Sequence, residues 1–402
     1  MRPKRIALVT QSYSSGGGVS TVAHWLRDGL TAGGYDVDVH DLATSSRDAH
    51  SRRLLVPGTW LRSSLRSRPA DGGHVTRWGA NAVEIETMRY RPRRELSRAL
   101  RGYDLIQVVS GSPAVASAVV GLGIPVLLQA ASPASVERRR RLDEETGVMR
   151  LWRALMTSLT SRLEKFAIRN VDAVFVENAS MVEYGRSCGQ RRTIKAPPGV
   201  DAAIFSPSPD GWNRRGYLLS VCRLNDVRKG LDRMVRAYAQ MVDQDPGVPD
   251  LVLAGLTQLP NSTQYLIADL GLALRVKTHS NIPPNALVTL YRGASVFLQT
   301  SYEEGFGMSL VEAMACGLPA VCTETAGSRE VVDDGVTGWL VPQTAGSHLT
   351  HLIADRVFHI LRGDGGSMGT RARERVKTMF STEVALQRYT SLYDELLATR
   401  NS

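Results

Sequence analysis

A chain of 402 residues is longer than one hydrophobic core usually supports, so we expect two domains. The four cysteines form no Cys-x2-Cys pair and have no histidine cluster beside them, which disfavours a zinc site and fits a reducing cytoplasm. The first apolar run, residues 6–9, is too short for a signal-peptide core or a membrane span, so we predict a buried strand there.

The net charge of +10 is concentrated in the first half of the chain. Residues 1–200 carry 30 Lys and Arg against 18 Asp and Glu, whereas residues 201–402 carry 19 against 21. Two basic runs, 91–94 and 138–141, fit an anionic membrane surface, an acidic acceptor, or simply solvated helix faces. Nucleic acid is disfavoured as a partner, because neither run is interleaved with aromatic residues.

Short apolar strands alternate with amphipathic helices through the first half, which is typical of a doubly wound parallel α/β domain. The predicted strands are 5–10, 36–41, 104–109, 126–129 and 173–177, and the predicted helices are 19–32 and 149–169. Residues 83–86 alternate like an exposed strand, and we predict that they form a hairpin with residues 75–78.

Consecutive prolines in the segment 195–201 exclude a helix and predict a domain boundary. We therefore assign residues 1–196 to a first domain and residues 197–379 to a second. The alternating pattern then resumes, with strands at 217–221, 250–254, 296–299 and 320–323, a helix at 231–243 and a last helix at 382–398.

The most informative segment is 301–319, in which Glu304 and Glu312 flank a glycine loop and the start of a helix. Gly305 and Gly307 permit a tight loop, and the sequence from Ser309 favours a helix that ends at Gly-Leu-Pro. A helix N-terminus attracts phosphate, and a carboxylate on its first turns accepts hydrogen bonds from a ribose diol. We therefore predict that Glu312 binds ribose and that Glu304 contacts the donor sugar or its phosphate.

Two further loops follow predicted strands and have the chemistry of a phosphate site. Arg223 and Lys229 lie after strand 217–221, at the edge where open α/β sheets bind ligands, and can neutralise a departing diphosphate. Gly17 and Gly18 follow the first strand and open a helix, so their backbone can approach phosphate or sugar atoms.

These segments together resemble the retaining glycosyltransferases of family 4. Residues 301–319 resemble the signature of two glutamates separated by seven residues, and residues 222–230 resemble the Gly-Arg-Leu-to-Lys-Gly motif, with Cys222 where Gly is usual. Residues 195–201 are similar to the family's hinge, and residues 325–341 are similar to a glycine-rich stretch that we assign to structure. The resemblance implies the GT-B fold, with two Rossmann-like doubly wound domains facing across a cleft and a C-terminal helix, about 380–402, crossing back to the first domain.

The resemblance also implies a set of site residues and a reaction. The catalytic residues would be Glu304, Arg223 and Lys229, with no metal and no cofactor. The donor-binding residues would be Gly17, Gly18, Arg223, Lys229, Glu304, Gly305, Phe306, Gly307, Met308, Ser309, Leu310 and Glu312. The enzyme would transfer a hexose or N-acetylhexosamine from a nucleotide sugar, with UDP as the first choice, to a hydroxyl and form an α-glycoside. In the front-face mechanism proposed for the family, the departing phosphate takes the acceptor's proton.

Acceptor recognition is where the chain departs from the family. The usual first-domain histidine is absent from the comparable segment 127–133, and none of His24, His40, His50 or His74 is assigned to replace it. The candidate acceptor contacts are Gln129, Ser132, Glu137, Arg138 and Asn178.

Several functions remain open at this point. The acceptor would be a bacterial secondary metabolite or a cell-envelope precursor, and the enzyme would be cytoplasmic. The alternative is a transferase at the inner face of the membrane that uses a lipid-linked acceptor. A sugar-nucleotide epimerase of the same fold and a catalytically silent membrane-associated binding protein are less favoured.

Overall fold

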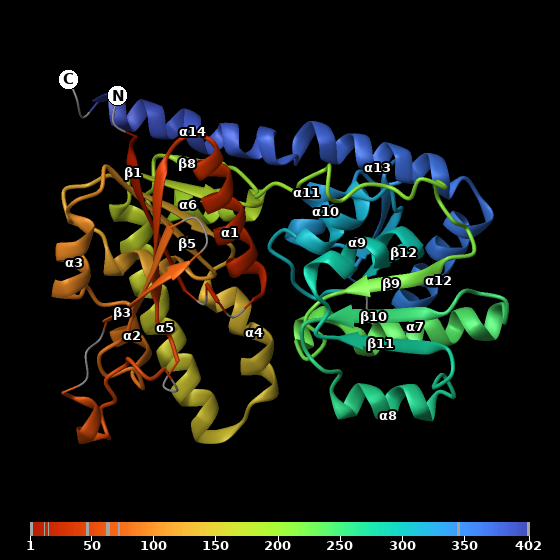
Figure 1. Ribbon diagram of the computed structural model, residues 1–402. Helices are drawn as coiled ribbons and strands as arrows, with labels where there is room; N and C mark the ends of the chain where they lie inside the picture. The colour runs from red at the N-terminus through yellow and green to blue at the C-terminus, as the bar shows by residue number, and fades with distance from the viewer. Residues whose placement is uncertain are drawn as a thin grey trace. The chain divides into compact units, whose positions relative to one another are not determined.

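The computed structural model describes residues 3–11, 13–14, 16–45, 48–61, 65–70, 73–343 and 346–399. The chain folds into two compact units (Figure 1). Unit 1 contains the residues up to Pro198 together with those from Leu386 onward, and unit 2 contains Gly199–Ala385. The expected boundaries were 196/197 and 379/380, so the second division lies further along the chain than expected, inside the last helix.

Unit 1 is built on a sheet with the strand order β3-β4-β2-β1-β5-β6-β7-β8. Its strands are β1 (Arg5–Gln11), β2 (Asp36–Leu42), β3 (Leu65–Ala70), β4 (Gly73–Trp78), β5 (Leu105–Ser110), β6 (Val126–Ala130), β7 (Ala173–Val176) and β8 (Thr193–Lys195). Every neighbouring pair except β3 and β4 is parallel. The sheet grows in opposite directions from β1, through β2 on one side and β5 on the other, as expected for a doubly wound domain.

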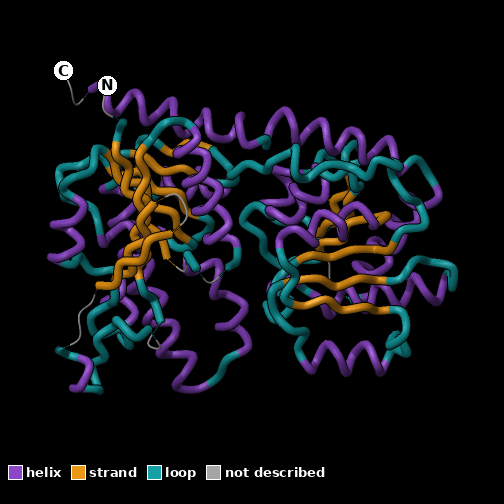
Figure 2. The backbone as a smooth tube through the Cα atoms, in the orientation of Figure 1, coloured by secondary structure: helices purple, strands orange, loops and turns teal. Residues whose placement is uncertain are grey.

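Helices cover both faces of this sheet (Figure 2). They are α1 (Gly18–Ala32), α2 (Glu86–Arg89), α3 (Arg94–Leu100), α4 (Ala134–Glu144), α5 (Gly147–Asn170), α6 (Ala179–Ser187) and the 3-10 helices η1 (Pro57–Thr59) and η2 (Pro113–Ala118). Successive residues of a strand point to opposite faces, so Ala7 and Val9 join one hydrophobic core and Ile6 and Leu8 join the other. This explains why the central strands read as continuous apolar runs.

The hairpin expected between residues 75–78 and 83–86 is wrong. The antiparallel partner of β4 is β3, whose six-residue register runs from Leu65 opposite Trp78 to Ala70 opposite Gly73. Residues 82–85 instead form a turn closed by a 2.9 Å hydrogen bond from Ile85 N–H to the Ala82 carbonyl, and α2 begins directly after it. Val83 is fully buried, and the Glu84 carboxylate accepts from Leu54 N–H, so the alternation of these residues reflects a packed turn.

The last helix, α14 (Thr382–Thr399), begins in unit 2 and continues in unit 1. Within unit 1 its Tyr389 hydroxyl lies 2.7 Å from Gln129 Oε1 and 2.9 Å from the Ala196 carbonyl. The Tyr393 hydroxyl donates to Gln107 Oε1 at 2.7 Å. Both tyrosines are fully buried, so α14 completes the core on one face of the unit 1 sheet.

Unit 2 has a fully parallel sheet with the order β11-β10-β9-β12-β13-β14. Its strands are β9 (Tyr217–Val221), β10 (Leu251–Gly255), β11 (Val276–Ser280), β12 (Ala294–Gln299), β13 (Ala320–Thr323) and β14 (Gly338–Val341). Its helices are η3 (Val227–Lys229), α7 (Leu231–Gln244), α8 (Asn261–Asp269), α9 (Pro284–Gly293), α10 (Met308–Ala315), α11 (Ala326–Val331), α12 (Ser347–Arg362) and α13 (Gly365–Met379). This strand order is that of the dinucleotide-binding Rossmann fold, and it reverses between β9 and β12.

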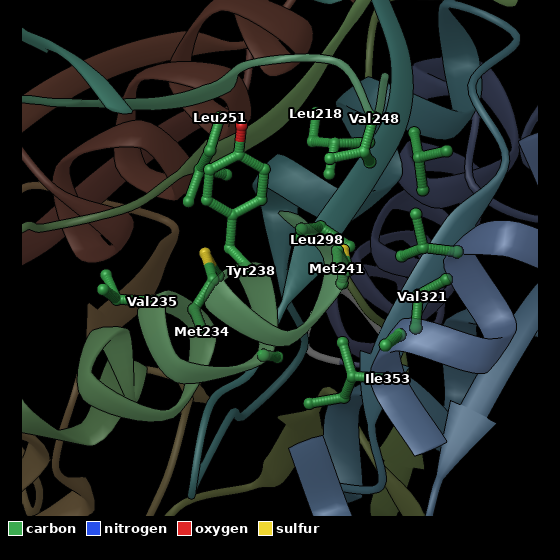
Figure 3. Close-up of a cluster of buried hydrophobic side chains, with 14 of the residues drawn as sticks. Leu218, Met234, Val235, Tyr238, Met241, Val248, Leu251, Leu298, Val321 and Ile353 are labelled. Atoms are coloured by element: carbon green, nitrogen blue, oxygen red, sulfur yellow. The ribbon is translucent and has the colours of Figure 1, made fainter. Parts of the chain in front are cut away.

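One of the two cores of unit 2 packs α7 and α12 against the sheet (Figure 3). Tyr238 and Met241 of α7 meet strand residues such as Leu251 and Leu298, and Ile353 of α12 lies in the same cluster. The Tyr238 hydroxyl donates to the Pro249 carbonyl at 3.0 Å, so its polar atom is satisfied while its ring is fully buried. This packing fixes β9 and the loop that follows it.

The two chain segments that connect the units are fastened to each other within unit 2. Val200 N–H donates to the Phe380 carbonyl at 2.8 Å, and Thr382 N–H donates to the Val200 carbonyl at 3.1 Å. A side chain at Gly199 would meet Ser381 and Thr382 backbone atoms at 2.8 Å, so only glycine fits this contact.

Candidate functional site

The predicted donor residues of unit 2 lie at the carboxyl ends of β9 and β12. These strands are neighbours in the sheet, and the strand order reverses between them. In an open α/β sheet this is the position where the loops diverge and a ligand binds. The loop after β9 carries Arg223 and Lys229, and the loop after β12 carries Glu304 and leads into α10.

Lys229 and Glu304 join the two loops. The Lys229 ammonium donates to Glu304 Oε2 at 2.7 Å, and the Ser301 hydroxyl donates to the same oxygen at 3.2 Å. Each charged side chain is 17% exposed, so the pair is shielded but reachable from solvent. An ammonium group has three N–H donors, and Glu304 uses one of them, so Lys229 retains capacity for phosphate oxygens.

Asp226 shapes the loop that presents Lys229. Its carboxylate accepts from Arg228 N–H at 3.1 Å and pairs with the Arg228 guanidinium at 2.7 Å, which begins η3. Burial alone would raise the pKa of Asp226, but the hydrogen bonds and charge of Arg228 lower it to about 2. Gly230 follows with φ of 61°, and a Cβ there would lie 2.4 Å from the Thr300 carbonyl, so this position brings the two loops into close contact.

Arg223 is exposed at the beginning of the same loop. Among the side chains that the structure describes, no ion pair of Arg223 is recorded. Its neighbour Cys222 is half-buried, and burial raises the pKa of the Cys222 thiol to about 12. Arg223 is therefore an exposed cation at the strand edge that already holds the Lys229–Glu304 pair.

Gly307 starts α10. Its φ of 98° lies in the region that favours glycine, and the Gly307 carbonyl accepts from the N–H groups of Leu310 and Val311 at 2.9 and 3.1 Å. The N–H groups of a helix's first turn have no acceptor within the helix, so Met308 and Ser309 bring donors to this end. The side chains of Phe306 and Leu310 are buried, and the Leu310 N–H is already donated to the Gly307 carbonyl, so the predicted donor contact of Leu310 lacks a free N–H.

Glu312 lies on the second turn of α10, partly exposed. Tyr291, from α9, donates its hydroxyl hydrogen to Glu312 Oε2 at 2.8 Å. Burial raises the pKa of Glu312 to about 7, although the hydrogen bond from Tyr291 acts in the opposite direction. The hydrogen bond thus holds the carboxylate in one orientation, while burial makes its ionised form less favourable.

Gly17 and Gly18 lie in unit 1, where α1 begins after β1. Gly17 has φ of 97°, and a Cβ on either glycine would meet no atom within 4 Å. The first turn of α1 carries no acidic residue that would repel an anion. The open backbone is compatible with an anion at this position, and the role of Gly17 and Gly18 in binding the donor stays a prediction.

The acceptor candidates of unit 1 divide into two groups. Gln129 is 1% exposed and its amide is engaged by Tyr389 and Glu177, while Asn178 is 2% exposed and caps α6 by accepting from Met181 N–H at 2.9 Å. Neither presents a polar group to an acceptor, so these two candidates are corrected to structural residues. Burial explains the two wrong predictions, because in the sequence a polar residue at a strand end or at a helix cap resembles a binding residue.

The other three acceptor candidates are more accessible. Arg138 pairs with Glu86 through two hydrogen bonds, one of them 2.9 Å long, and this ties α4 to α2. Ser132, two residues before α4, and Glu137, in the first turn of α4, are half-buried. The side chains of Arg140 and Arg141 lie outside the described residues, as does that of His74.

The remaining first-half histidines have structural surroundings. His40 is buried between Trp78 and Tyr103, which contact its ring nitrogens at 3.1 and 3.2 Å, and burial lowers its pKa to about 4. His24 stacks on Tyr13 with ring centroids 3.9 Å apart, on the first turns of α1. His50 lies in the segment between β2 and β3.

Sequence reasoning missed Tyr291 and Asp226 as site residues. Tyr291 lies in α9, 21 residues before Glu312, and no local signal connects the two. Asp226 had a signal, because an aspartate two residues before Arg228 in a short loop is typical of a capped turn.

Within the described part of the chain, no group of three or more His, Cys, Asp or Glu side chains is arranged to hold a metal ion. Nor does any described helix combine the length and apolar content that a membrane span requires.

Comparison with known proteins identifies the family. The model of Glycosyltransferase Family 4 matches residues 16–204, and the model of Glycosyl transferases group 1 matches residues 209–357. A D-inositol 3-phosphate glycosyltransferase of Acidothermus cellulolyticus is 30% identical over 377 residues, which cover 84% of this chain and 79% of that protein. Its counterpart in Corynebacterium glutamicum is 26% identical over 296 residues, covering 69% and 68%.

Solved structures agree on the fold. Sucrose-phosphate synthase from Thermosynechococcus elongatus has a TM-score of 0.72 at 21% identity and covers 98% of this chain and 100% of that one. Anabaena HepE in complex with UDP and glucose has a TM-score of 0.68 at 17% identity, with coverage of 98% and 100%. These likenesses, the two parallel sheets and the family models lead to one conclusion: the chain belongs to glycosyltransferase family 4 and is a glycosyltransferase with the GT-B fold.

Proposed function

We propose that this enzyme transfers a hexose or N-acetylhexosamine from a UDP-sugar to a hydroxyl group, with retention of configuration and without a divalent metal. The observation that carries the proposal is the 2.7 Å contact between Lys229 and Glu304. It places an ammonium and a carboxylate at the strand-order reversal of unit 2, next to the N-terminus of α10. A diphosphate needs positive charge and N–H donors, and a sugar needs acceptors for its hydroxyl hydrogens.

In this proposal each site residue has a defined role. Lys229 and Arg223 neutralise the diphosphate in place of a metal, and backbone N–H groups at the start of α10, those of Met308 and Ser309, donate hydrogen bonds to it. Glu304 orients the sugar and holds Lys229, while Glu312 accepts from the ribose hydroxyls. Gly17 and Gly18 of unit 1 offer an open backbone at the start of α1, which suits an anionic group.

The reaction step follows from these roles. The acceptor oxygen forms a bond to C1 of the sugar while the bond from C1 to the phosphate oxygen breaks, on the same face. The acceptor proton passes to a phosphate oxygen of the departing UDP, so no side-chain base is needed. Because the positive charge of Arg223 and Lys229 stabilises UDP as it leaves, their contribution is greatest in the transition state.

Two comparisons support the choice of UDP and of an alcohol acceptor. HepE was solved with UDP, with UDP and glucose, and with UDP-glucose, and the pneumococcal O-GlcNAc transferase GtfA was solved with UDP and GlcNAc. The curated relatives are named for D-inositol 3-phosphate, a phosphorylated polyol. We propose a bacterial metabolite or cell-envelope precursor as acceptor in the cytoplasm, with phosphorylated polyols as the first compounds to test.

The test is calorimetric titration of UDP, GDP, dTDP and ADP, with and without EDTA, into the wild type and the Arg223→Ala variant. We expect selective binding of UDP that EDTA leaves unchanged and that falls at least tenfold in the variant. NMR analysis of the first glycoside product then reports the anomeric configuration, and an α-product from an α-donor supports retention. Preference for another nucleotide, loss of binding in EDTA, or undiminished turnover by Arg223→Ala contradicts the corresponding part of the proposal.

A further inference from the structure

Unit 1 carries two segments with several large apolar side chains exposed at its surface. On the first half of α5, Val148, Met149, Leu151, Trp152 and Leu155 are exposed, with Val148 at 81% and Leu151 at 72%. Their spacing of three and four residues places Val148, Leu151 or Trp152, and Leu155 on one face of the helix. The buried face of α5 begins only at Met156, so the first turns of the helix turn an apolar face outward.

The second segment surrounds η1. Leu54, Leu55, Val56, Trp60 and Leu61 are exposed, with Leu55 at 81% and Leu61 at 99%. The Trp60 indole N–H donates to the Arg53 carbonyl at 2.9 Å, which holds the ring at the surface. A short loop that presents this many large apolar side chains has a high cost in water, and such patches mark interaction surfaces.

Contacts within unit 1 link the loop around η1 to α4 and to the middle of α5. Glu84 binds the loop around η1 through two hydrogen bonds. Leu54 N–H donates to Glu84 Oε2 at 2.9 Å, and the Arg53 guanidinium donates to Glu84 Oε1 at 3.0 Å. Two residues later, Glu86 pairs with Arg138 of α4 and accepts from the Thr160 hydroxyl of α5 at 3.2 Å. In Figure 1 the orange-red loop and the connection between α4 and α5 both lie at the lower end of unit 1.

Two exposed arginines accompany the apolar residues. A groove between α4 and α5 is lined by Ser135, Val136, Arg139, Leu142, Arg150, Ala154 and Thr157. Among the described side chains, no carboxylate partner of Arg139 or Arg150 is recorded, whereas neighbouring Arg153 pairs with Glu145 at 2.7 Å. The groove therefore offers two cations beside apolar side chains, a combination that matches an anionic amphiphile.

We propose that this end of unit 1, the two apolar segments with Arg139 and Arg150, docks on an anionic lipid bilayer. Leucine, methionine and tryptophan side chains insert at the boundary between headgroups and acyl chains, where tryptophan is favoured, while the arginines bind headgroup phosphates. The inference is independent of the donor assignment. If both hold, the enzyme works at the membrane surface, and acceptors presented on lipid become accessible to it.

The test is sedimentation of the full chain with vesicles of pure phosphatidylcholine and with vesicles in which phosphatidylglycerol makes up about a third of the lipid, a strongly anionic surface. We expect binding to the anionic vesicles that weakens as the salt concentration rises, and little binding to the neutral ones. The Leu151→Ala/Trp152→Ala and Leu61→Asp variants should each lose most of this binding. The Arg139→Ala/Arg150→Ala variant should bind at least tenfold more weakly, since each arginine near an anionic surface is worth about fivefold.

Matched controls lie in unit 2. Tyr265 and Leu274 are 67% and 91% exposed, and Arg236 is exposed on α7, so Tyr265→Ala/Leu274→Ala and Arg236→Ala remove the same chemistry from another surface. Both should bind vesicles like the wild type, and all variants should retain UDP affinity and the wild-type melting curve. An equal loss in Arg236→Ala would reduce the effect to net charge, an equal loss in Tyr265→Ala/Leu274→Ala would reduce it to non-specific apolar contact, and either result would overturn the proposal.

Failure to sediment with either vesicle also overturns the proposal. If light scattering then shows self-association that Leu151→Ala/Trp152→Ala abolishes, the face is an interface between copies of the chain. UDP titration in the same samples separates this outcome from failure of the donor assignment, because the docking residues lie in unit 1 and the nucleotide contacts tested lie in unit 2.

Discussion

Replacing Glu312 with glutamine separates what this carboxyl does for stability from what it does for binding. The ordinary carboxyl pKa is 4.5, and burial raises the pKa of Glu312 to about 7 in the folded protein. The folded state therefore binds its proton more tightly than the unfolded state does. The contribution to stability is fully present below pH 4.5 and is lost as the pH rises through 7.

The magnitude follows from these two values. A pKa increase from 4.5 to about 7 corresponds to roughly 3 kcal/mol, and we expect about 2 kcal/mol because the side chain is partly exposed. The glutamine side chain of the Glu312→Gln variant is neutral at every pH and can still accept the hydrogen bond from Tyr291. At about pH 8 this variant should therefore melt roughly 4–8 °C above the wild type, and at about pH 5 the difference should nearly vanish.

The same change should weaken nucleotide binding. A carboxylate accepts from both ribose hydroxyls, whereas the amide of glutamine offers one oxygen acceptor, so we expect UDP affinity to fall about tenfold at about pH 8. Thermal unfolding at these two pH values, with and without UDP, measures both effects. The control is Glu183→Gln, which changes an exposed carboxyl of α6. Equal melting differences at the two pH values would refute the argument from burial.

Three other substitutions test separate parts of the structure. Lys229→Ala removes a diphosphate contact and leaves half-buried Glu304 without its cation, so kcat/KM should fall at least a hundredfold in a donor-saturation assay, with a lower melting temperature. Gly18→Ala meets no atom within 4 Å, so its melting temperature should match the wild type while KM for the donor rises several-fold. Tyr389→Phe leaves the buried Gln129 oxygen unsatisfied and should lower the free energy of unfolding by about 1–2 kcal/mol in urea titrations, with UDP affinity unchanged.

Much of the fold could be predicted from the sequence because central parallel strands are buried on both faces and read as apolar runs. Helix α5 was expected at 149–169 and spans Gly147–Asn170, since its long periodic pattern dominates the local signal. The turn at 82–85 was misread because a packed turn can alternate apolar and polar residues as a strand does. The local sequence pattern does not reveal which distant segment Val83 packs against.

The candidate site shows the same division between local and distant information. The common location of the glycines, cations and carboxylates could be predicted from the sequence, because they lie in loops after strands. Parallel strands bring their carboxyl ends to one edge of the sheet. The role of Tyr291 was not readable, since its contact with Glu312 depends on how α9 packs against α10. The prediction of Gln129 and Asn178 as acceptor contacts was wrong because the sequence does not show whether a polar residue near a strand end is buried.

The path of α14 has a consequence for the order in which this protein is made. Tyr389 and Tyr393 complete the core of unit 1, but the ribosome synthesises them only after all of unit 2. At about 5–20 residues per second, the delay is roughly ten to forty seconds. During that interval Gln107 and Gln129 of the nascent unit 1 lack their tyrosine partners. The apolar surface that α14 covers stays exposed to water, which leaves the unit prone to aggregation until translation reaches α14.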